Sequence, residues 1–150
     1  MDKPEYDIDF YAWTQAQAKA LRVKAWDVLD IEHLAEEIED LGKEQRHALA
    51  SHLRILLLYL LKWAYQAERR GESWRHSINN ARAEIDGRLA MSPSLRRDLP
   101  TFLGWAYPRA RRAAADETGL APTTFPETCP WSLEQLLNDE FLPERVDRGS

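Results

Sequence analysis

The chain has 150 residues, of which 44% are hydrophobic and 30% are charged, and its formal net charge is −5. This is enough apolar material for one packed domain over residues 1–150 and too much for a disordered chain. The single cysteine, Cys129, excludes an internal disulfide framework and a zinc site of several cysteines, and the acidic balance disfavours a general nucleic-acid binder.

The N-terminal residues contain no cationic segment followed by an apolar one, so secretion is not expected. The most apolar run, residues 55–61, ends at Lys62 and is far shorter than the ~20 residues that a membrane span needs. We therefore expect a soluble, cytoplasmic protein with no membrane partner.

Apolar residues at steps of three and four predict a first helix over residues 9–22, which Asp7 or Asp9 can cap. A second helix is predicted over residues 30–66, with Asp30 as its N-cap. An unbroken helix of this length would be about 55 Å long, whereas a compact domain of this size has a radius of gyration of only about 15 Å. Either the helix breaks near Gly42, or one end projects and is covered by another surface, such as a second copy of the chain.

The apolar stripe of this second helix passes through its whole length. Its later part, residues 53–65, is apolar on nearly every side, which is typical of a helix buried at the centre of a bundle. We therefore place this part in the core. The stripe consists of Leu34, Ile38, Leu41, Leu49, Leu53, Leu56, Leu60 and Trp63.

Three further helices complete the predicted fold. One runs over residues 73–90 with Ser73 as N-cap, and the next opens at Ser92-Pro93 and ends before Gly119. The last is short and begins with a capping box at Ser132. Prolines 100 and 108 predict kinks in the fourth helix. Since no segment alternates as a strand, we predict an all-α bundle of about five helices with one long central helix.

Charge is segregated along the chain. Residues 1–44 carry a net charge of −7, residues 45–112 of +8, and residues 113–150 of −6. This pattern suggests that the acidic ends fold against the basic middle, or that two chains pair out of register. An ordinary solvated surface with weak ion pairs explains the counts equally well.

The motifs of common enzyme classes are missing from the sequence. It contains no G-x-G-x-x-G, P-loop, G-x-S-x-G or H-E-x-x-H pattern. Helical pairs such as Glu44 with His47, or Glu72 with His76, are incomplete as metal sites, and solvated side chains explain them better. Cys129 is best explained as a packed or exposed thiol. We therefore predict no catalytic residue, no metal and no cofactor.

A binding site for a ligand or partner is nevertheless predicted where acidic and basic helix faces meet. The basic middle combines arginines with tryptophans, and Arg75 and Arg82 share a helix face beside Trp74. An intramolecular alternative pairs these arginines with the acidic start of the second helix. The predicted site residues are Glu36, Glu37, Trp63, Trp74, Arg75 and Arg82.

Several short motifs in a fixed order carry a resemblance to a known family. They include Tyr6-x-x-Asp9-Phe10-Tyr11-x-Trp13, Leu34-Ala35-Glu36-Glu37-Ile38-Glu39-x-Leu41-Gly42, Leu60-Leu61-Lys62-Trp63, Ser73-Trp74-Arg75, Ser92-Pro93-Ser94-Leu95-Arg96 and Phe141-Leu142-Pro143. From about Tyr6 to Pro143 the chain resembles the bacterial domain-of-unknown-function family 29. This resemblance implies no assigned activity. Tyr59 stands where members often carry His, and Ala67 where Pro is common.

Three functions follow as hypotheses. We favour a non-catalytic helical interaction module that self-associates or binds a protein partner, because the acidic helix is over-long and catalytic motifs are missing. The first alternative is nucleic-acid binding by the arginine-rich middle, which the low isoelectric point disfavours. The second is a small ligand- or metal-binding enzyme with a pocket near Glu36, Glu37, Trp63 and Arg75.

Overall fold

The computed structural model describes residues 5–148 and divides the chain into two compact units, Met1–Glu44 and Gln45–Ser150. Five α-helices and four short 3-10 turns make up the regular structure, and residues 5–148 include no strand, so the all-α prediction is confirmed. None of the helices over these residues is both long and apolar enough to cross a bilayer. That residues 1–150 act as one domain stays a prediction.

The first unit consists of α1 (Phe10–Arg22), a 3-10 turn at Trp26–Val28 and the start of α2 (Ile31–Tyr65). The Asp9 carboxylate accepts a hydrogen bond of 3.0 Å from the Ala12 N–H, which confirms it as the N-cap of α1. Trp13, Gln17 and Ala20 form the buried face of α1. This unit has a small core because only one side of a single helix is covered.

Helix α2 is continuous over 35 residues and does not break at Gly42. Of the two possibilities left open by the sequence, the unbroken helix is therefore the correct one. The predicted apolar stripe has two different environments. From Leu49 onward its members are buried, whereas Ile38 and Leu41 are 67% and 62% exposed.

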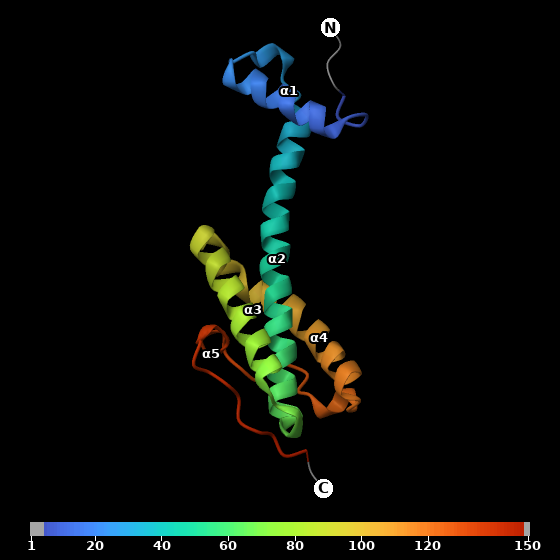
Figure 1. Cartoon of the computed structure of the whole chain (residues 1–150), viewed down its shortest axis with the longest axis vertical. Helices are drawn as coiled ribbons and strands as arrows, with labels where there is room; N and C mark the ends of the chain where they lie inside the picture. Colours follow the sequence, from blue (N-terminus) through green and yellow to red (C-terminus); the bar gives the residue numbers. More distant parts are fainter. Residues whose placement is uncertain (1–4, 149–150) are drawn as a thin grey trace. The chain divides into compact units, whose positions relative to one another are not determined.

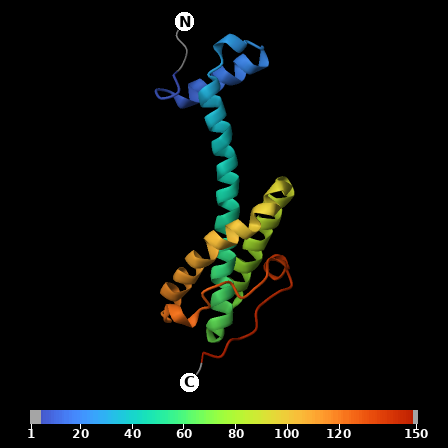
Figure 2. The ribbon, with the colours of Figure 1, turned by 180° about the vertical axis from the view of Figure 1, so that it is seen from behind.

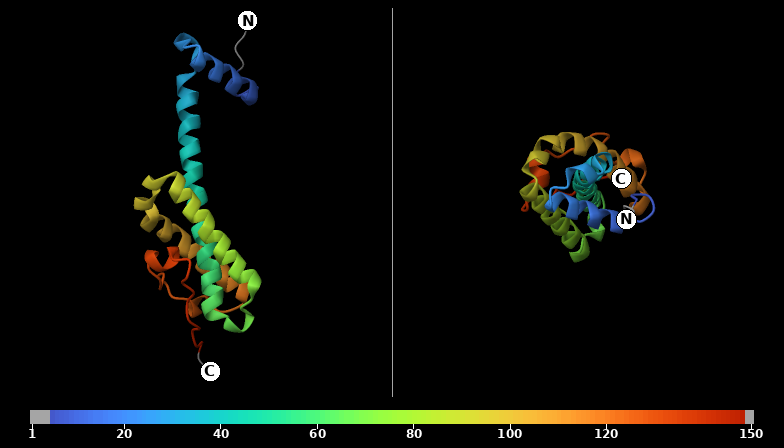
Figure 3. Two further views of the ribbon diagram at one scale, coloured as in Figure 1. Left: turned by 60° about the vertical axis from the view of Figure 1, so that its left-hand side comes forward. Right: turned by 90° about the horizontal axis from the view of Figure 1, so that it is seen from above.

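The second unit surrounds the later part of α2. Helices α3 (Glu72–Met91) and α4 (Leu99–Thr118) flank this part in Figures 1 and 2, and α3 runs back along it in Figure 3. Residues 53–65 lie in the core as predicted, together with apolar side chains of α3, α4 and the C-terminal segment. The fully buried members include Leu49, Leu53, Leu56, Leu57, Leu60, Leu61, Ile78, Ile85, Phe125 and Leu136.

The starts of α3 and α4 differ from the predicted ones. The N-cap of α3 is Gly71 rather than Ser73, and Glu72 then lies in the first turn, where the helix dipole favours a negative charge. Residues Pro93–Asp98 form a 3-10 helix, so α4 begins at Leu99. Pro100 therefore lies in the first turn, where a missing N–H costs no hydrogen bond, and α4 continues past Pro108 to its end.

The segment after α4 is largely irregular and packs on the helices of the second unit. Gly119 ends α4 in the left-handed conformation with φ of 75°, and Ser132 with Gln135 forms the predicted capping box of α5 (Leu133–Leu137). Hydrogen bonds from side chains fix this segment. The Tyr107 hydroxyl donates to the Pro126 carbonyl over 2.6 Å, and burial raises the Tyr107 pKa above its usual value.

Candidate functional site

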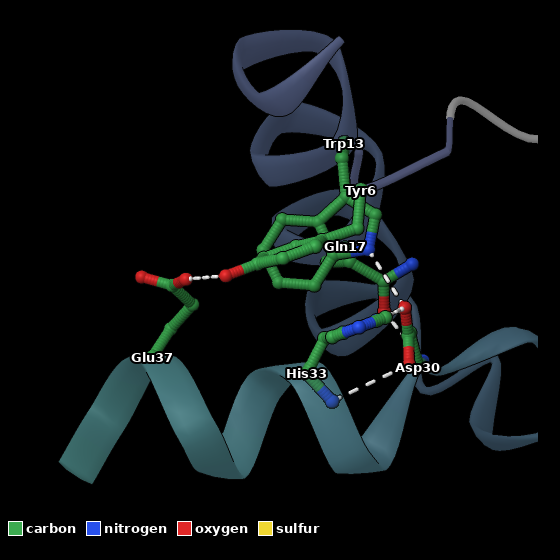
Figure 4. A network of polar contacts seen from close by, with 6 residues as sticks. All are labelled: Tyr6, Trp13, Gln17, Asp30, His33 and Glu37. Atoms are coloured by element: carbon green, nitrogen blue, oxygen red, sulfur yellow. Dashed lines mark hydrogen bonds and ion pairs between the residues drawn. The ribbon is translucent and has the colours of Figure 1, made fainter. Parts of the chain in front are cut away.

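Asp30 organises the first unit. Its carboxylate accepts hydrogen bonds from Trp13 Nε1 over 3.0 Å and from His33 Nδ1 over 2.7 Å, as Figure 4 shows. Its backbone N–H donates to Gln17 Oε1 over 2.8 Å. Because Trp13 and Gln17 belong to α1 while His33 belongs to α2, this single residue fastens the two helices together at the predicted N-terminus of α2.

Tyr6 covers the other side of the His33 ring. The two rings stack with centroids 4.0 Å apart and planes within 6°, and Trp13 meets Tyr6 edge-on at 4.9 Å. The Tyr6 hydroxyl donates a hydrogen bond to the Glu37 carboxylate one turn further along α2 (Figure 4). The segment before α1 is therefore tied to α2 by both an aromatic and a polar contact.

The hydrogen bonds of this network shift the pKa values of its members. The hydrogen bond from His33 lowers the pKa of Asp30, and the same bond raises the pKa of His33 above its usual value. Donation to Glu37, burial and the neighbouring negative charges raise the pKa of Tyr6 to about 12. At neutral pH the network therefore favours an ionised Asp30 and a neutral Tyr6.

A solvent-open cavity of about 440 Å³ lies beside this network. An Asp–His pair can orient an imidazole and pass a proton, but among the described residues that line this cavity none is a Ser, Thr or Cys that could serve as a nucleophile. Residues 5–148 contain no group of three or more His, Cys, Asp or Glu side chains placed to hold a metal ion. The cavity is lined by Glu5, Tyr6, Asp7, Trp13, Gln17, Val28, Asp30 and His33.

Exposed apolar side chains are concentrated in the first unit. Over the described residues eleven large hydrophobic side chains are exposed, and nine of them precede Glu44, although this unit is the smaller one. Where exposed apolar side chains lie next to one another, the surface they form is typical of one that another molecule covers. The nine are Ile8, Phe10, Tyr11, Leu21, Val23, Trp26, Ile31, Ile38 and Leu41, and the other two are Met91 and Val146.

The predicted site residues divide between the two units. Glu36 is exposed and Glu37 contacts Tyr6, both in the first unit. In the second unit the Arg75 guanidinium lies 5.7 Å from the centre of the Trp63 ring. That Glu36 and Glu37 share a pocket with Trp63 and Arg75 stays a prediction.

Trp63 and Trp74 are stabilised by cations of their own unit. The Arg70 guanidinium lies 5.0 Å from the centre of the Trp63 ring, and Lys62 Nζ lies 5.0 Å from that of Trp74. Lys62 also forms an ion pair of 3.1 Å with Glu117 of α4, which sequence analysis missed because 55 residues separate the two. These contacts hold the tryptophans in place inside the unit.

Arg82 lies at the centre of the second unit and is only 2% exposed. Its guanidinium donates to the backbone carbonyls of Leu136, Phe141 and Gln135 over 2.8, 2.7 and 3.4 Å. Two of these carbonyls, those of Gln135 and Leu136, belong to α5, and the Gln135 carbonyl also accepts the N–H of Asn138 at the end of the helix. Burial lowers the pKa of Arg82, and the three carbonyls compensate the cost of burying its charge. A binding role for Arg82 stays a prediction.

Other arginines of the basic middle also bind groups of their own unit. Arg70 donates to the Trp63 carbonyl in the last turn of α2 over 2.7 Å, and Arg111 donates to the Phe125 carbonyl over 3.1 Å. Arg46 pairs with Asp98 over 2.7 Å. Arg70, Arg82 and Arg111 therefore stabilise helix ends and the C-terminal segment, and nucleic-acid binding by the basic middle stays a prediction.

Sequence reasoning missed Tyr6, Trp13 and His33 as members of one network. The available signal was the spacing of Asp30 and His33, which places an N-cap carboxylate beside a side chain one turn later. The contacts of Tyr6 and Trp13 depend on how α1 lies against α2, which no local pattern specifies.

A family model for the domain of unknown function DUF29 matches residues 5–142, nearly the whole chain. The chain belongs to the DUF29 family. The resemblance stated from the short motifs is thus confirmed. No curated protein and no solved structure matches this DUF29 protein.

Proposed function

We propose that this DUF29 protein is a helical interaction module that self-associates through its first unit. One observation carries the proposal: nine of the eleven exposed large hydrophobic side chains of residues 5–148 lie before Glu44. Leaving such side chains in water is unfavourable, and burying an Ile or Leu fully contributes about 1.5–3 kcal/mol. A second protein surface would remove them from water.

The partner surface that suits this unit in a second copy is the same unit. In the second unit only Met91 and Val146 are large hydrophobic side chains exposed among residues 45–148, and they offer little apolar area. A pairing of the first unit with itself is isologous and closes as a dimer. Since association costs about 4–15 kcal/mol, several of these apolar side chains must be buried together for the dimer to form.

The charge of the first unit gives this pairing a characteristic salt dependence. Residues 1–44 carry a net charge of −7, so two such units repel each other. Added salt screens this repulsion and leaves apolar contacts intact. The dimer is therefore expected to tighten as NaCl is raised, whereas pairing of an acidic end with a basic middle would weaken.

The oligomeric state of the full chain tests the proposal. Multi-angle light scattering and sedimentation equilibrium between about 1 and 200 µM are expected to show a monomer–dimer equilibrium that shifts to dimer at high salt. A monomer throughout this range at every salt concentration would overturn the proposal.

Matched variants locate the interface. Ile38→Glu and Leu41→Glu each place a charge on an exposed apolar position of the first unit and are expected to abolish the dimer. Met91→Glu is the control, because Met91 is 77% exposed but belongs to the second unit, and it should dimerise like the wild type. Circular dichroism verifies that all three variants keep their helix content.

A further inference from the structure

The exposed part of α2 has the spacing of a two-stranded coiled coil. With Ile31 at position a of a heptad, Leu34 falls at d, Ile38 at a and Leu41 at d. Isoleucine at a with leucine at d favours parallel two-stranded coiled coils. Ile31, Ile38 and Leu41 are 68%, 67% and 62% exposed, and Leu34 is half-buried.

The α1 segment covers one side of this stripe and leaves the other side open. On the side of the g positions, Glu37 and Asp30 bind Tyr6 and Trp13, so the α1 segment occupies this flank (Figure 4). The e positions on the other side are Ala35 and Gly42. A Cβ built on Gly42 meets nothing within 4 Å, so this flank is open and its small residues allow a second helix to approach closely.

Charge selects the orientation of the two helices. The g positions Asp30, Glu37 and Glu44 are all acidic. In a parallel pair each g residue faces an e residue of the other helix, so Glu37 faces Gly42 of the second copy and meets no charge. In an antiparallel pair g residues face g residues, and the acidic side chains repel one another. Only the parallel pair avoids this repulsion.

Resting on the proposed self-association, we propose that residues 31–45 of two copies pair as a parallel, in-register coiled coil whose close side is formed by Ala35 and Gly42. Two heptads alone are too short for a stable coiled coil. The exposed apolar residues that precede α2 therefore extend this interface, namely Ile8, Phe10, Tyr11, Leu21, Val23 and Trp26. The partner of this surface is a second copy of the chain.

Cysteine cross-linking reads the orientation directly. Ile31→Cys and Leu41→Cys are made separately in the full chain with Cys129→Ser, oxidised, and examined on non-reducing gels. The parallel pair predicts that each variant cross-links with itself. Cross-linking only in a mixture of the two variants would overturn the parallel orientation while leaving the dimer, and hence the proposed function, intact.

Two substitutions of opposite charge at Gly42 provide a second test, made in the chain that keeps Cys129. Gly42→Lys places a positive charge opposite Glu37 of the second copy, and Gly42→Glu places a negative one there. Both residues favour helix similarly. The dissociation constant is expected to fall about fivefold for Lys and rise about fivefold for Glu at low salt.

The two outcomes separate this inference from the proposed function. Equal dissociation constants for Gly42→Lys and Gly42→Glu in a chain that still dimerises would overturn the parallel coiled coil alone. If the wild-type chain is monomeric at every salt concentration, the proposed function fails first and this inference with it.

Discussion

Arg82, in the middle of α3, donates a hydrogen bond of 2.7 Å to the backbone carbonyl of Phe141, 59 residues later in the chain. The same guanidinium satisfies two carbonyls of α5. A buried charge is tolerated only when its donors find acceptors, and an irregular segment is held only when its carbonyls find donors. The arginine and the C-terminal segment therefore depend on each other for their stability.

Replacing Arg82 by Met should unfold the C-terminal attachment. The side chain keeps much of its length, but the carbonyls of Leu136 and Phe141 lose their side-chain donor, and we expect a loss on the order of 3 kcal/mol in the free energy of unfolding. Urea denaturation measures this loss, and hydrogen exchange should show reduced protection for residues 133–143.

Arg82→Lys is the control for charge. An ammonium group keeps the positive charge but lacks the planar arrangement that reaches carbonyls in three directions. It should therefore recover only a small part of the lost stability. Full recovery by Lys would show that charge alone, and not the directed hydrogen bonds, holds the segment.

The Asp30–His33 pair predicts an altered titration of His33. The hydrogen bond to the Asp30 carboxylate raises the His33 pKa above its usual value, so Asp30→Asn should lower it. Two-dimensional NMR of the histidine ring protons measures both values. An unchanged His33 pKa in Asp30→Asn would contradict the pairing.

The same pair predicts how the attachment of α1 depends on pH. Because the folded pKa of His33 is raised, its contribution is complete below its unfolded value near 6.5 and is lost as pH rises through the folded pKa. Because the folded pKa of Asp30 is lowered, the stability that Asp30 contributes is complete above its unfolded value of 3.8 and is lost as pH falls through the folded pKa. The protection of the α1 amides against hydrogen exchange, corrected for the intrinsic exchange rates, should therefore be greatest between about pH 4 and 6.5.

Local signals predicted much of the fold. The Asp9 cap, the capping box at Ser132 and the end of α4 at Gly119 each depend on a few neighbouring residues, and the structure confirms all three. The burial of residues 53–65 followed from a segment that is apolar on nearly every side.

Contacts between distant segments were beyond sequence analysis. One periodic stripe links Leu34 to Trp63, yet it is exposed at Ile38 and buried at Leu53, because periodicity does not reveal which part of a helix its own chain covers. Likewise, the sequence did not indicate which groups Arg82 contacts, and the structure supplies acceptors from carbonyls more than 50 residues away. A ligand- or partner-binding role for Arg82 stays a prediction. Backbone acceptors leave no pattern in the sequence.

Gly104 inside α4 and Gly119 at its C-cap should respond in opposite ways to alanine. Gly119 adopts φ of 75°, where a Cβ is strained, so Gly119→Ala should destabilise the second unit by about 1 kcal/mol. Gly104 lies inside α4 with nothing within 4 Å of a built Cβ, so Gly104→Ala should stabilise it by up to about 1 kcal/mol. Thermal denaturation compares the two, and a change of the same sign would contradict the assigned end of α4.

Trp13 is the main apolar anchor of the first unit, 2% exposed and bound to Asp30 through its indole N–H. Trp13→Ala removes a buried ring, a change that costs about 3–5 kcal/mol in a well-packed core. We expect α1 to lose its exchange protection while the core amides of α3 and α4 keep theirs, since their buried contacts belong to the second unit. Tyr11→Ala, on the same helix but 65% exposed, should leave α1 protected. Loss of protection throughout α3 and α4 in Trp13→Ala would instead show that the two units unfold together.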